Sequence, residues 1–280
     1  MKVRVISSLV GLVILGVVLF FLDTLLLNAV IGLISIMAVF EVLSATKSTK
    51  FPGLCVLAIL MAIVIPFVQL NFIIALIPQI VFVFILAMFA LLLKDHQKLR
   101  TERAVMVFFF ALFIPLFFSS AIFMRNMFGA AVGGMYLLWA LGSAWLSDTG
   151  AFFAGRAFGR HKLAPLISPK KTVEGAVGGV VTACLGMLLL GFAYQSVTAA
   201  FGAEIHIDYP LLLAVTPLFS AIGILGDLSA SVIKRQFGVK DYGSIMPGHG
   251  GILDRFDSAM FTIPAVFIVV RHITVVWGVY

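Results

Sequence analysis

Two polar segments interrupt an otherwise apolar chain, and their residues are of the types that bind metal ions and phosphates. In the second segment, Asp227 is followed by Lys234 and Arg235, and Asp254 and Asp257 lie farther along. Mg²⁺ is usually held by one or two carboxylates together with phosphate oxygens of the substrate. We therefore predict that Asp227 and Asp254 bind a metal ion, with Asp257 as a third ligand or as a support to the other two.

The residues after Asp227 have the spacing of one helix face. Ser231, Lys234 and Arg235 follow at +4, +7 and +8, so a continuing helix would place these side chains on the same side as Asp227. An unpaired carboxylate near a membrane is costly. Lys234 or a metal ion is therefore expected to neutralise Asp227, and Ser231 and Arg235 are candidate contacts for a substrate.

A glycine-rich turn over residues 247–251 lies between these charged groups. Gly250 and Gly251 have no side chain, so the backbone there can approach a nucleotide closely. A lone histidine is more often structural, but His249 stands between glycines and near two aspartates in the sequence. We therefore expect His249 to contact a phosphate or a base.

The first polar segment begins at Asp148, which is expected to end an apolar helix. Three interpretations are open: a metal ligand, a partner for a nearby cation, or a solvated helix end. The two functional interpretations together are favoured over the last.

The sequence from Ser168 to Thr172 predicts a phosphate site. Pro169 is placed just before a helix start, where proline is tolerated. Free backbone N–H groups at a helix start attract anions, and Thr172, Lys170 and Lys171 would add a hydroxyl and two ammonium groups at one spot. The segment lacks the glycine-rich run of a P-loop. The alternative is a basic loop that faces acidic lipid.

The composition indicates a membrane protein. Of the 280 residues, 62% are hydrophobic and 11% are charged, and the mean hydropathy is +1.18. Soluble domains carry about 25% charged residues, whereas the apolar runs here reach the roughly 20 residues that cross a bilayer. We predict an all-α, polytopic transmembrane protein of about nine spans, the first retained rather than cleaved as a signal peptide. The predicted spans are 5–22, 25–46, 53–70, 72–93, 104–124, 129–147, 175–198, 209–228 and 257–277.

The basic residues predict the orientation. With a cytoplasmic N-terminus, 17 of the 19 Lys and Arg residues fall on the cytoplasmic side, as the positive-inside rule requires. This distribution explains the net charge of +7 without nucleic acid as a partner. We predict a multi-pass protein of the cytoplasmic (inner) membrane, with spans one to five in 1–128 and a catalytic region in 129–280. The cytoplasmic loops of that region would be 148–174 and 227–256.

Small residues recur at helical spacing in two of the predicted spans. Gly129 and Gly133 form one pair, and Gly175 and Gly179 form another. Such pairs allow helices to approach closely. Packing within one chain is the favoured interpretation, and a homodimer seam is left open.

At these residues the chain resembles the phosphatidate cytidylyltransferases, also called CDP-diacylglycerol synthases. Their signature runs Ser-x-apolar-Lys-Arg, four residues, Lys-Asp, then Pro-x-His-Gly-Gly-apolar-x-Asp-Arg-apolar-Asp. One departure is Ala230, where many bacterial members carry Glu. The matching positions are Ser231, Lys234, Arg235, Lys240, Asp241, Pro247, His249, Gly250, Gly251, Asp254, Arg255 and Asp257, and upstream Asp148, Gly155, Gly159, Ser168, Pro169, Lys171, Thr172 and Gly175.

The resemblance implies an enzyme that transfers CMP from CTP to phosphatidate and releases pyrophosphate. It implies a need for Mg²⁺, with a monovalent cation such as K⁺ beside it. Because the lipid phosphate is itself the nucleophile, no general base is needed, and the protein has to screen anions and hold them in line. The implied roles are metal binding for Asp227 and Asp254, phosphate binding for Lys171, Lys234 and Arg255, and nucleotide or phosphate contacts for Ser168, Thr172 and His249.

Two other functions are open. A nucleotidyltransferase that acts on another lipid phosphate would need the same residue types. An ion-coupled transporter would place charges deep in the membrane, whereas here the charges gather at one interface and only Glu41 is expected to be buried elsewhere. We expect Glu41 to pair with Lys47 or with a cation of the substrate site.

Overall fold

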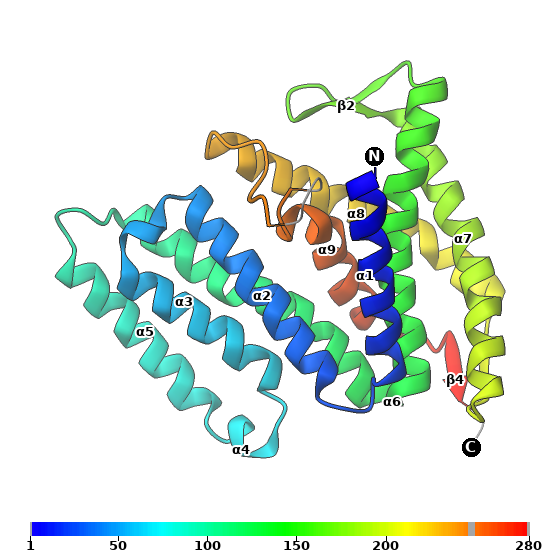
Figure 1. The fold of residues 1–280 in the computed structure, drawn as a ribbon, viewed down its shortest axis with the longest axis horizontal. Helices are drawn as coiled ribbons and strands as arrows, with labels where there is room; N and C mark the ends of the chain where they lie inside the picture. Colours follow the sequence, from blue (N-terminus) through cyan, green and yellow to red (C-terminus); the bar gives the residue numbers. More distant parts are fainter. Residues whose placement is uncertain (1, 246–249, 279–280) are drawn as a thin grey trace. The chain divides into compact units, whose positions relative to one another are not determined.

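The computed structural model describes residues 2–245 and 250–278 and is predominantly helical (Figure 1). Short 3₁₀ turns at Ser48–Lys50 and Ile65–Phe67 flank the third helix. The α-helices are α1 (Lys2–Phe20), α2 (Leu26–Ala45), α3 (Pro52–Val64), α4 (Asn71–Ile74), α5 (Ile77–Lys94), α6 (Thr101–Phe158), α7 (Val173–Ala200), α8 (Tyr209–Gln236) and α9 (Leu253–Val270).

The predicted all-α class of membrane protein agrees with these elements. In the part of the chain that the structure describes, five helices, α2, α5, α6, α7 and α8, are long and apolar enough to cross a membrane. Shorter apolar helices cover Leu9–Phe20 and Pro52–Phe67. Helix overlaps every one of the nine predicted runs, whereas the number of runs that cross the membrane and the side of the N-terminus stay predictions.

Helix α6 consists of two helices that meet at a kink at Gly129, where the backbone is not helical. The φ of 77° at Gly129 is in the left-handed region that glycine adopts readily. This kink agrees with the predicted boundary between the spans 104–124 and 129–147, whereas the end of the second helix differs from the prediction. Gly129 is therefore a bend rather than a packing contact, since a Cβ added there would meet nothing within 4 Å. The helix then continues to Phe158, so the predicted helix end before Asp148 was wrong.

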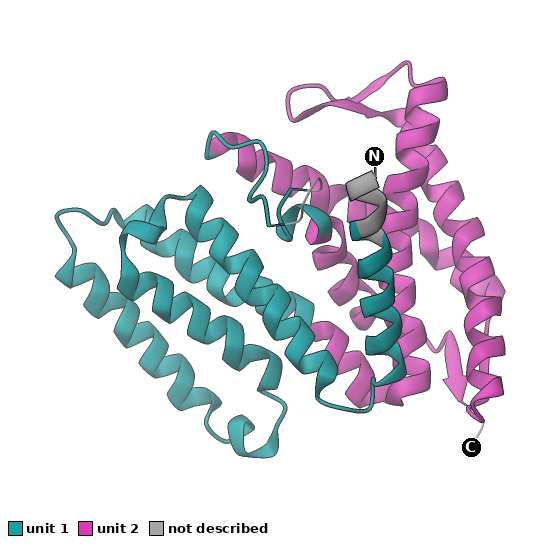
Figure 2. Cartoon of the chain, viewed as in Figure 1, with its two compact units in different colours: residues 1–119, 237–255 teal, residues 120–236, 256–280 magenta. Residues whose placement is uncertain are grey.

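The chain forms two compact units built from non-contiguous segments (Figure 2). Unit 1 contains residues 1–119 and 237–255, and unit 2 contains residues 120–236 and 256–280. In unit 1, α2 packs on α3, and Asn28 donates a hydrogen bond of 2.7 Å to the carbonyl of Pro66.

The core of unit 2 is built around the second half of α6. Close glycine contacts bring α7 against it: a Cβ at Gly179 would lie 2.5 Å from the carbonyl oxygen of Ser147. On α8, Thr216 accepts a hydrogen bond of 2.9 Å from the indole of Trp139, and Thr262 of α9 donates one of 2.9 Å to the carbonyl of Ala140. These contacts fix α7, α8 and α9 around one buried helix, and for Gly179 they agree with packing inside one chain.

Two small antiparallel sheets, which the sequence did not predict, complete unit 2. The first joins β1 (Lys162–Ala164) to β2 (Ser168–Thr172) and lies between α6 and α7 in the chain. The second joins β3 (Ile205–Ile207) to β4 (Val276–Gly278). Strand β3 lies between the predicted spans 175–198 and 209–228, and β4 overlaps the end of the predicted last span.

Candidate functional site

A short hairpin positions the first group of site residues. Lys162 of β1 faces Thr172 of β2 in the register, and α7 begins at the next residue. Thr172 caps that helix: its Oγ1 accepts a hydrogen bond of 3.1 Å from the N–H of Gly175. The helix start predicted near Thr172 is confirmed, whereas Pro169 lies in β2 instead of at the helix start.

Glu174, in the first turn of α7, holds the residues that precede β1. Its carboxylate accepts hydrogen bonds from the backbone N–H of Arg160, at 3.0 Å, and of His161, at 3.2 Å. It also lies 2.6 Å from Nδ1 of His161. The chain between α6 and α7 is therefore held at both ends, and strand β2 has a defined orientation.

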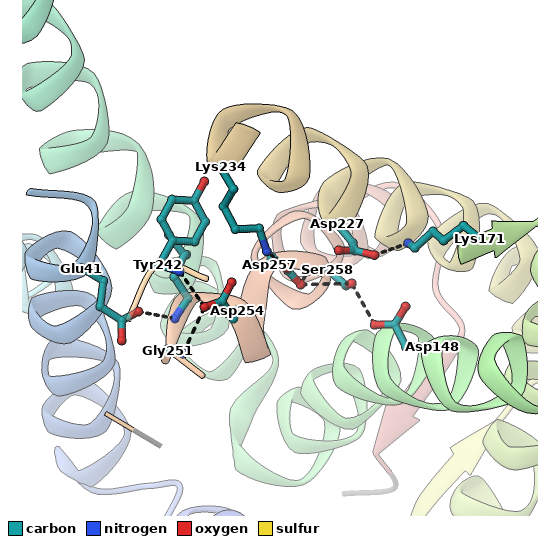
Figure 3. A network of polar contacts seen from close by, with 11 residues as sticks. Glu41, Asp148, Lys171, Asp227, Lys234, Tyr242, Gly251, Asp254, Asp257 and Ser258 are labelled. Atoms are coloured by element: carbon teal, nitrogen blue, oxygen red, sulfur yellow. Dashed lines mark hydrogen bonds and ion pairs between the residues drawn. The ribbon is translucent and has the colours of Figure 1, made fainter. Parts of the chain in front are cut away.

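That orientation separates the two neighbouring lysines of β2. Successive side chains of a strand point to opposite faces. Lys170 is exposed, whereas Lys171 forms an ion pair with Asp227 of α8 (Figure 3). The Nζ atom of Lys171 is shielded from solvent. The expectation that both ammonium groups face one spot was therefore wrong, and only Lys171 faces the carboxylate.

Three carboxylates of unit 2 come together from three helices. Asp257 of α9 is 6% exposed and interacts electrostatically with Asp227 of α8 and Asp148 of α6. Ser258 connects two of them (Figure 3). Its hydroxyl donates a hydrogen bond of 3.0 Å to Asp148, and its backbone N–H donates one of 2.8 Å to Asp257. Asp148 is thus a half-buried, hydrogen-bonded member of this group rather than a solvated helix end.

Lys234 supplies a second cation to the same group. Its Nζ lies 3.9 Å from the carboxylate of Asp257, and the two side chains are 11% and 8% exposed. Helix α8 does continue past Asp227, as the spacing predicted. The cation nearest to Asp227 nevertheless comes from β2, since Lys171 pairs with Asp227 and Lys234 with Asp257.

Asp254 belongs to a separate polar cluster in unit 1. Its Oδ2 accepts hydrogen bonds from the backbone N–H of Tyr242, at 2.8 Å, and of Gly251, at 3.0 Å (Figure 3). The side chain is 9% exposed and lies in the first turn of α9. Asp254 therefore links the backbone of Tyr242 and of Gly251 to the first turn of α9. The predicted shared metal site of Asp227 and Asp254 stays a prediction, because the two residues lie in different units.

Glu41 completes the unit 1 cluster in a way the sequence did not predict. It is 2% exposed, and its two carboxylate oxygens accept hydrogen bonds from the N–H groups of Ile252, at 2.8 Å, and Leu253, at 2.9 Å (Figure 3). The partners are backbone N–H groups at the start of α9, so the expected pairing with Lys47 or a substrate-site cation was wrong. The available signal was a single carboxylate in an apolar run, which has to be satisfied by some donor.

The remaining predicted residues are distributed around these clusters. Ser168 faces Ala164 in the hairpin register, Ser231 of α8 is half-buried, and Arg235 is exposed. Arg255 is exposed in the first turn of α9. Gly250 has a φ of 85°, a conformation that favours glycine. His249 lies outside the described residues.

The three carboxylates of unit 2 offer oxygen ligands, which suit a hard divalent cation such as Mg²⁺. Within residues 2–245 and 250–278, no three His, Cys, Asp or Glu side chains lie so that they could hold a metal ion by themselves. Lysines and a serine hydroxyl contact the carboxylates instead. A cation shared with substrate phosphates needs only one or two carboxylates, and Asp148, Asp227 and Asp257 are the candidates for that role.

Comparison with known sequences gives the family. A sequence model described as "Cytidylyltransferase family" matches residues 2–273. The chain belongs to the Cytidylyltransferase family. Three relatives, each named phosphatidate cytidylyltransferase, come from Staphylococcus epidermidis (49% identical over 132 residues), Staphylococcus haemolyticus (48% over 129) and Bacillus subtilis (44% over 157). These matches cover 47%, 46% and 56% of this chain and 47%, 46% and 54% of the relatives, so the chain spans about half the length of the curated relatives it matches.

Proposed function

We propose that this chain transfers CMP from CTP to phosphatidate, giving CDP-diacylglycerol and pyrophosphate. The observation that carries the proposal is the group of three carboxylates and two lysines in unit 2, gathered from α6, α8, α9 and β2. The names of the relatives and the matching sequence motif support the substrates. The apolar helices suit an enzyme whose lipid substrate stays in a bilayer.

The reaction needs two anions to meet. An oxygen of the phosphatidate phosphate attacks the α-phosphorus of CTP, a new P–O bond forms, and the bond to the bridging oxygen of the β-phosphate breaks, so that pyrophosphate leaves with that electron pair. The attacking oxygen is already anionic, so no proton has to be removed. The chief barriers are the repulsion between anions and the need for an in-line approach.

Asp148, Asp227 and Asp257 would hold Mg²⁺, and Asp254 is a further proposed ligand. When bound, the cation supplies charge neutralisation on the phosphates of CTP. A monovalent cation such as K⁺ beside it is proposed from the family resemblance alone.

Cationic and hydroxyl side chains would bind and orient the phosphates. Lys171 and Lys234 already lie at the carboxylates, and Arg255 follows in the first turn of α9. Thr172 and the β2 backbone hold Lys171 in place. Ser168, Ser231 and Arg235, together with the turn that includes His249, Gly250 and Gly251, are proposed nucleotide or phosphate contacts.

The proposed setting is the inner face of the cytoplasmic membrane, with a cytoplasmic N-terminus and a site that opens to lipid. CTP would arrive from the cytoplasm and phosphatidate from the bilayer. A homodimer stays a proposal without a described interface, and nucleic acid is not proposed as a partner.

The test is a membrane assay for CTP-dependent conversion of phosphatidate in the presence of Mg²⁺. We expect Asp227→Asn to lower the rate by about 100-fold or more, as loss of a key electrostatic group does. Lys47→Gln, an exposed change in the turn after α2, should leave the rate unchanged. If only another lipid phosphate, such as a polyprenyl phosphate, accepts CMP, the nucleotidyltransferase stands but phosphatidate is the wrong substrate.

A further inference from the structure

The ion pair between Lys171 and Asp227 occupies the carboxylate to which the proposed function assigns the metal ion (Figure 3). The two side chains are 24% and 23% exposed, and the Nζ atom of Lys171 is shielded from solvent. A shielded ammonium group needs its counter-charge, because removing an ion from water is costly unless the ion is paired. The carboxylate thus already has a cation supplied by the chain itself.

Lys171 is also held firmly in that position. Its backbone belongs to β2, which pairs with β1, and the next residue, Thr172, caps α7. Glu174 fixes the far end of the hairpin through Arg160 and His161. Movement of the hairpin is therefore restricted, and the freedom to leave Asp227 lies in the flexible stem of the lysine side chain.

We propose that the ammonium group of Lys171 is a built-in competitor for the divalent cation at Asp227. The inference rests on the proposed function for the identity of the cation. In the absence of nucleotide, Lys171 neutralises Asp227 and weakens binding of the cation. When nucleotide and cation bind together, Lys171 would leave Asp227 and pair with a phosphate oxygen, and the carboxylate of Asp227 would be available to hold the cation. The enzyme would thus bind the cation and the nucleotide together rather than the bare cation first.

Charge supports this exchange. The two lysines offset negative charge of the carboxylates and so weaken the attraction for a bare divalent cation, whereas each lysine that turns to a phosphate leaves the group more negative. Lys171 contacts Asp227 directly, while Lys170 on the opposite face of the same strand is exposed. The two lysines differ by one position, so they form a matched pair for a test.

The test measures Mn²⁺ binding, followed by the electron paramagnetic resonance signal of free Mn²⁺, to the full-length protein without nucleotide. We expect Lys171→Gln to tighten Mn²⁺ binding by about tenfold, which corresponds to about 1.4 kcal/mol. Lys170→Gln should change Mn²⁺ binding by less than about twofold, because an exposed charge is screened by solvent. Lys171→Met, which keeps the aliphatic stem, should reproduce the gain if Lys171→Gln does not fold. Adding Asp227→Asn to Lys171→Gln should abolish the gain.

The outcomes separate the inference from the proposed function. If the wild type converts phosphatidate and the Lys171 variants bind Mn²⁺ no more tightly than the wild type, the inference is wrong and the function stands. An equal gain in Lys170→Gln would also overturn it, because a general charge effect would then suffice. If the gain occurs without any CTP-dependent turnover of the wild type, the exchange stands and the substrate assignment fails. If no variant binds Mn²⁺ and no turnover is seen, both are wrong.

Discussion

Glu41 is predicted to hold the start of α9, and its removal should loosen that start specifically. The carboxylate accepts two hydrogen bonds, of 2.8 Å from Ile252 and 2.9 Å from Leu253, in a site where it is 2% exposed. Hydrogen bonds to charged groups contribute about 1.5–3 kcal/mol each. Glu41→Ala leaves both N–H groups without this acceptor, so we expect a loss of about 3–6 kcal/mol in the stability of this region. Glu41→Gln keeps one acceptor oxygen and should cost about half as much.

The assay is amide hydrogen exchange on the detergent-solubilised protein, because exchange reports local opening. Protection at Ile252 and Leu253 should fall by about 100-fold or more in Glu41→Ala, at the 1.4 kcal/mol per factor of ten that applies to any equilibrium. The control is Asn28→Ala on the same helix, which removes a buried hydrogen bond to Pro66 and should leave exchange at these two amides unchanged relative to the rest of α9. Unchanged protection at Ile252 and Leu253 in Glu41→Ala would refute the assigned role.

Three further predictions concern the elements that hold the site. Thr172→Ala removes the cap of α7 and should lower the free energy of unfolding by about 0.5–2 kcal/mol, measured by thermal unfolding. Thr198→Ala, near the other end of α7, should have a smaller effect because the hydroxyl of Thr198 bonds only within the helix. Glu174→Gln should weaken the hydrogen bonds that hold the backbone of Arg160 and His161 to α7. We expect faster limited proteolysis between residues 160 and 167, and an unchanged cleavage rate would argue against this role of Glu174. Gly179→Ala should destabilise unit 2 by about 1–3 kcal/mol, since the added Cβ would lie 2.5 Å from a backbone oxygen of Ser147. Gly186→Ala should be better tolerated, because its nearest neighbour is the flexible end of Leu146, and equal losses in the two glycine variants would contradict the backbone contact as the cause.

The sequence predicted the helices well where hydrophobic length decides the structure. The apolar runs of α2, α5, α7 and α8 were found because a membrane-spanning helix needs a long uninterrupted run. The helix ends were predicted less well: α6 continues past Asp148 to Phe158, since a single carboxylate does not stop a helix whose neighbours pack against it.

The candidate site was predictable in its residue types but not in its partners. Asp148, Asp227 and Asp257 were identified from the sequence, and the structure brings them together from three helices. The pairing of Lys171 with Asp227 depends on a hairpin that pairs residues ten positions apart, a contact that helix periodicity does not reveal. The role of Glu41 depends on contacts more than two hundred residues away in the chain, for which no local pattern exists.

The measurement that tests the central claim most directly is the rate of CDP-diacylglycerol formation as a function of Mg²⁺ concentration. The variants are Asp257→Asn and Asp148→Asn, compared with Asp208→Asn, which changes a carboxylate at the far end of α8 that accepts a hydrogen bond from Leu211. We expect the first two to lower the rate by about 100-fold or more or to require much higher Mg²⁺, and Asp208→Asn to match the wild type in its Mg²⁺ dependence. Wild-type rates and Mg²⁺ dependence in both Asp257→Asn and Asp148→Asn would contradict a metal site built from these carboxylates.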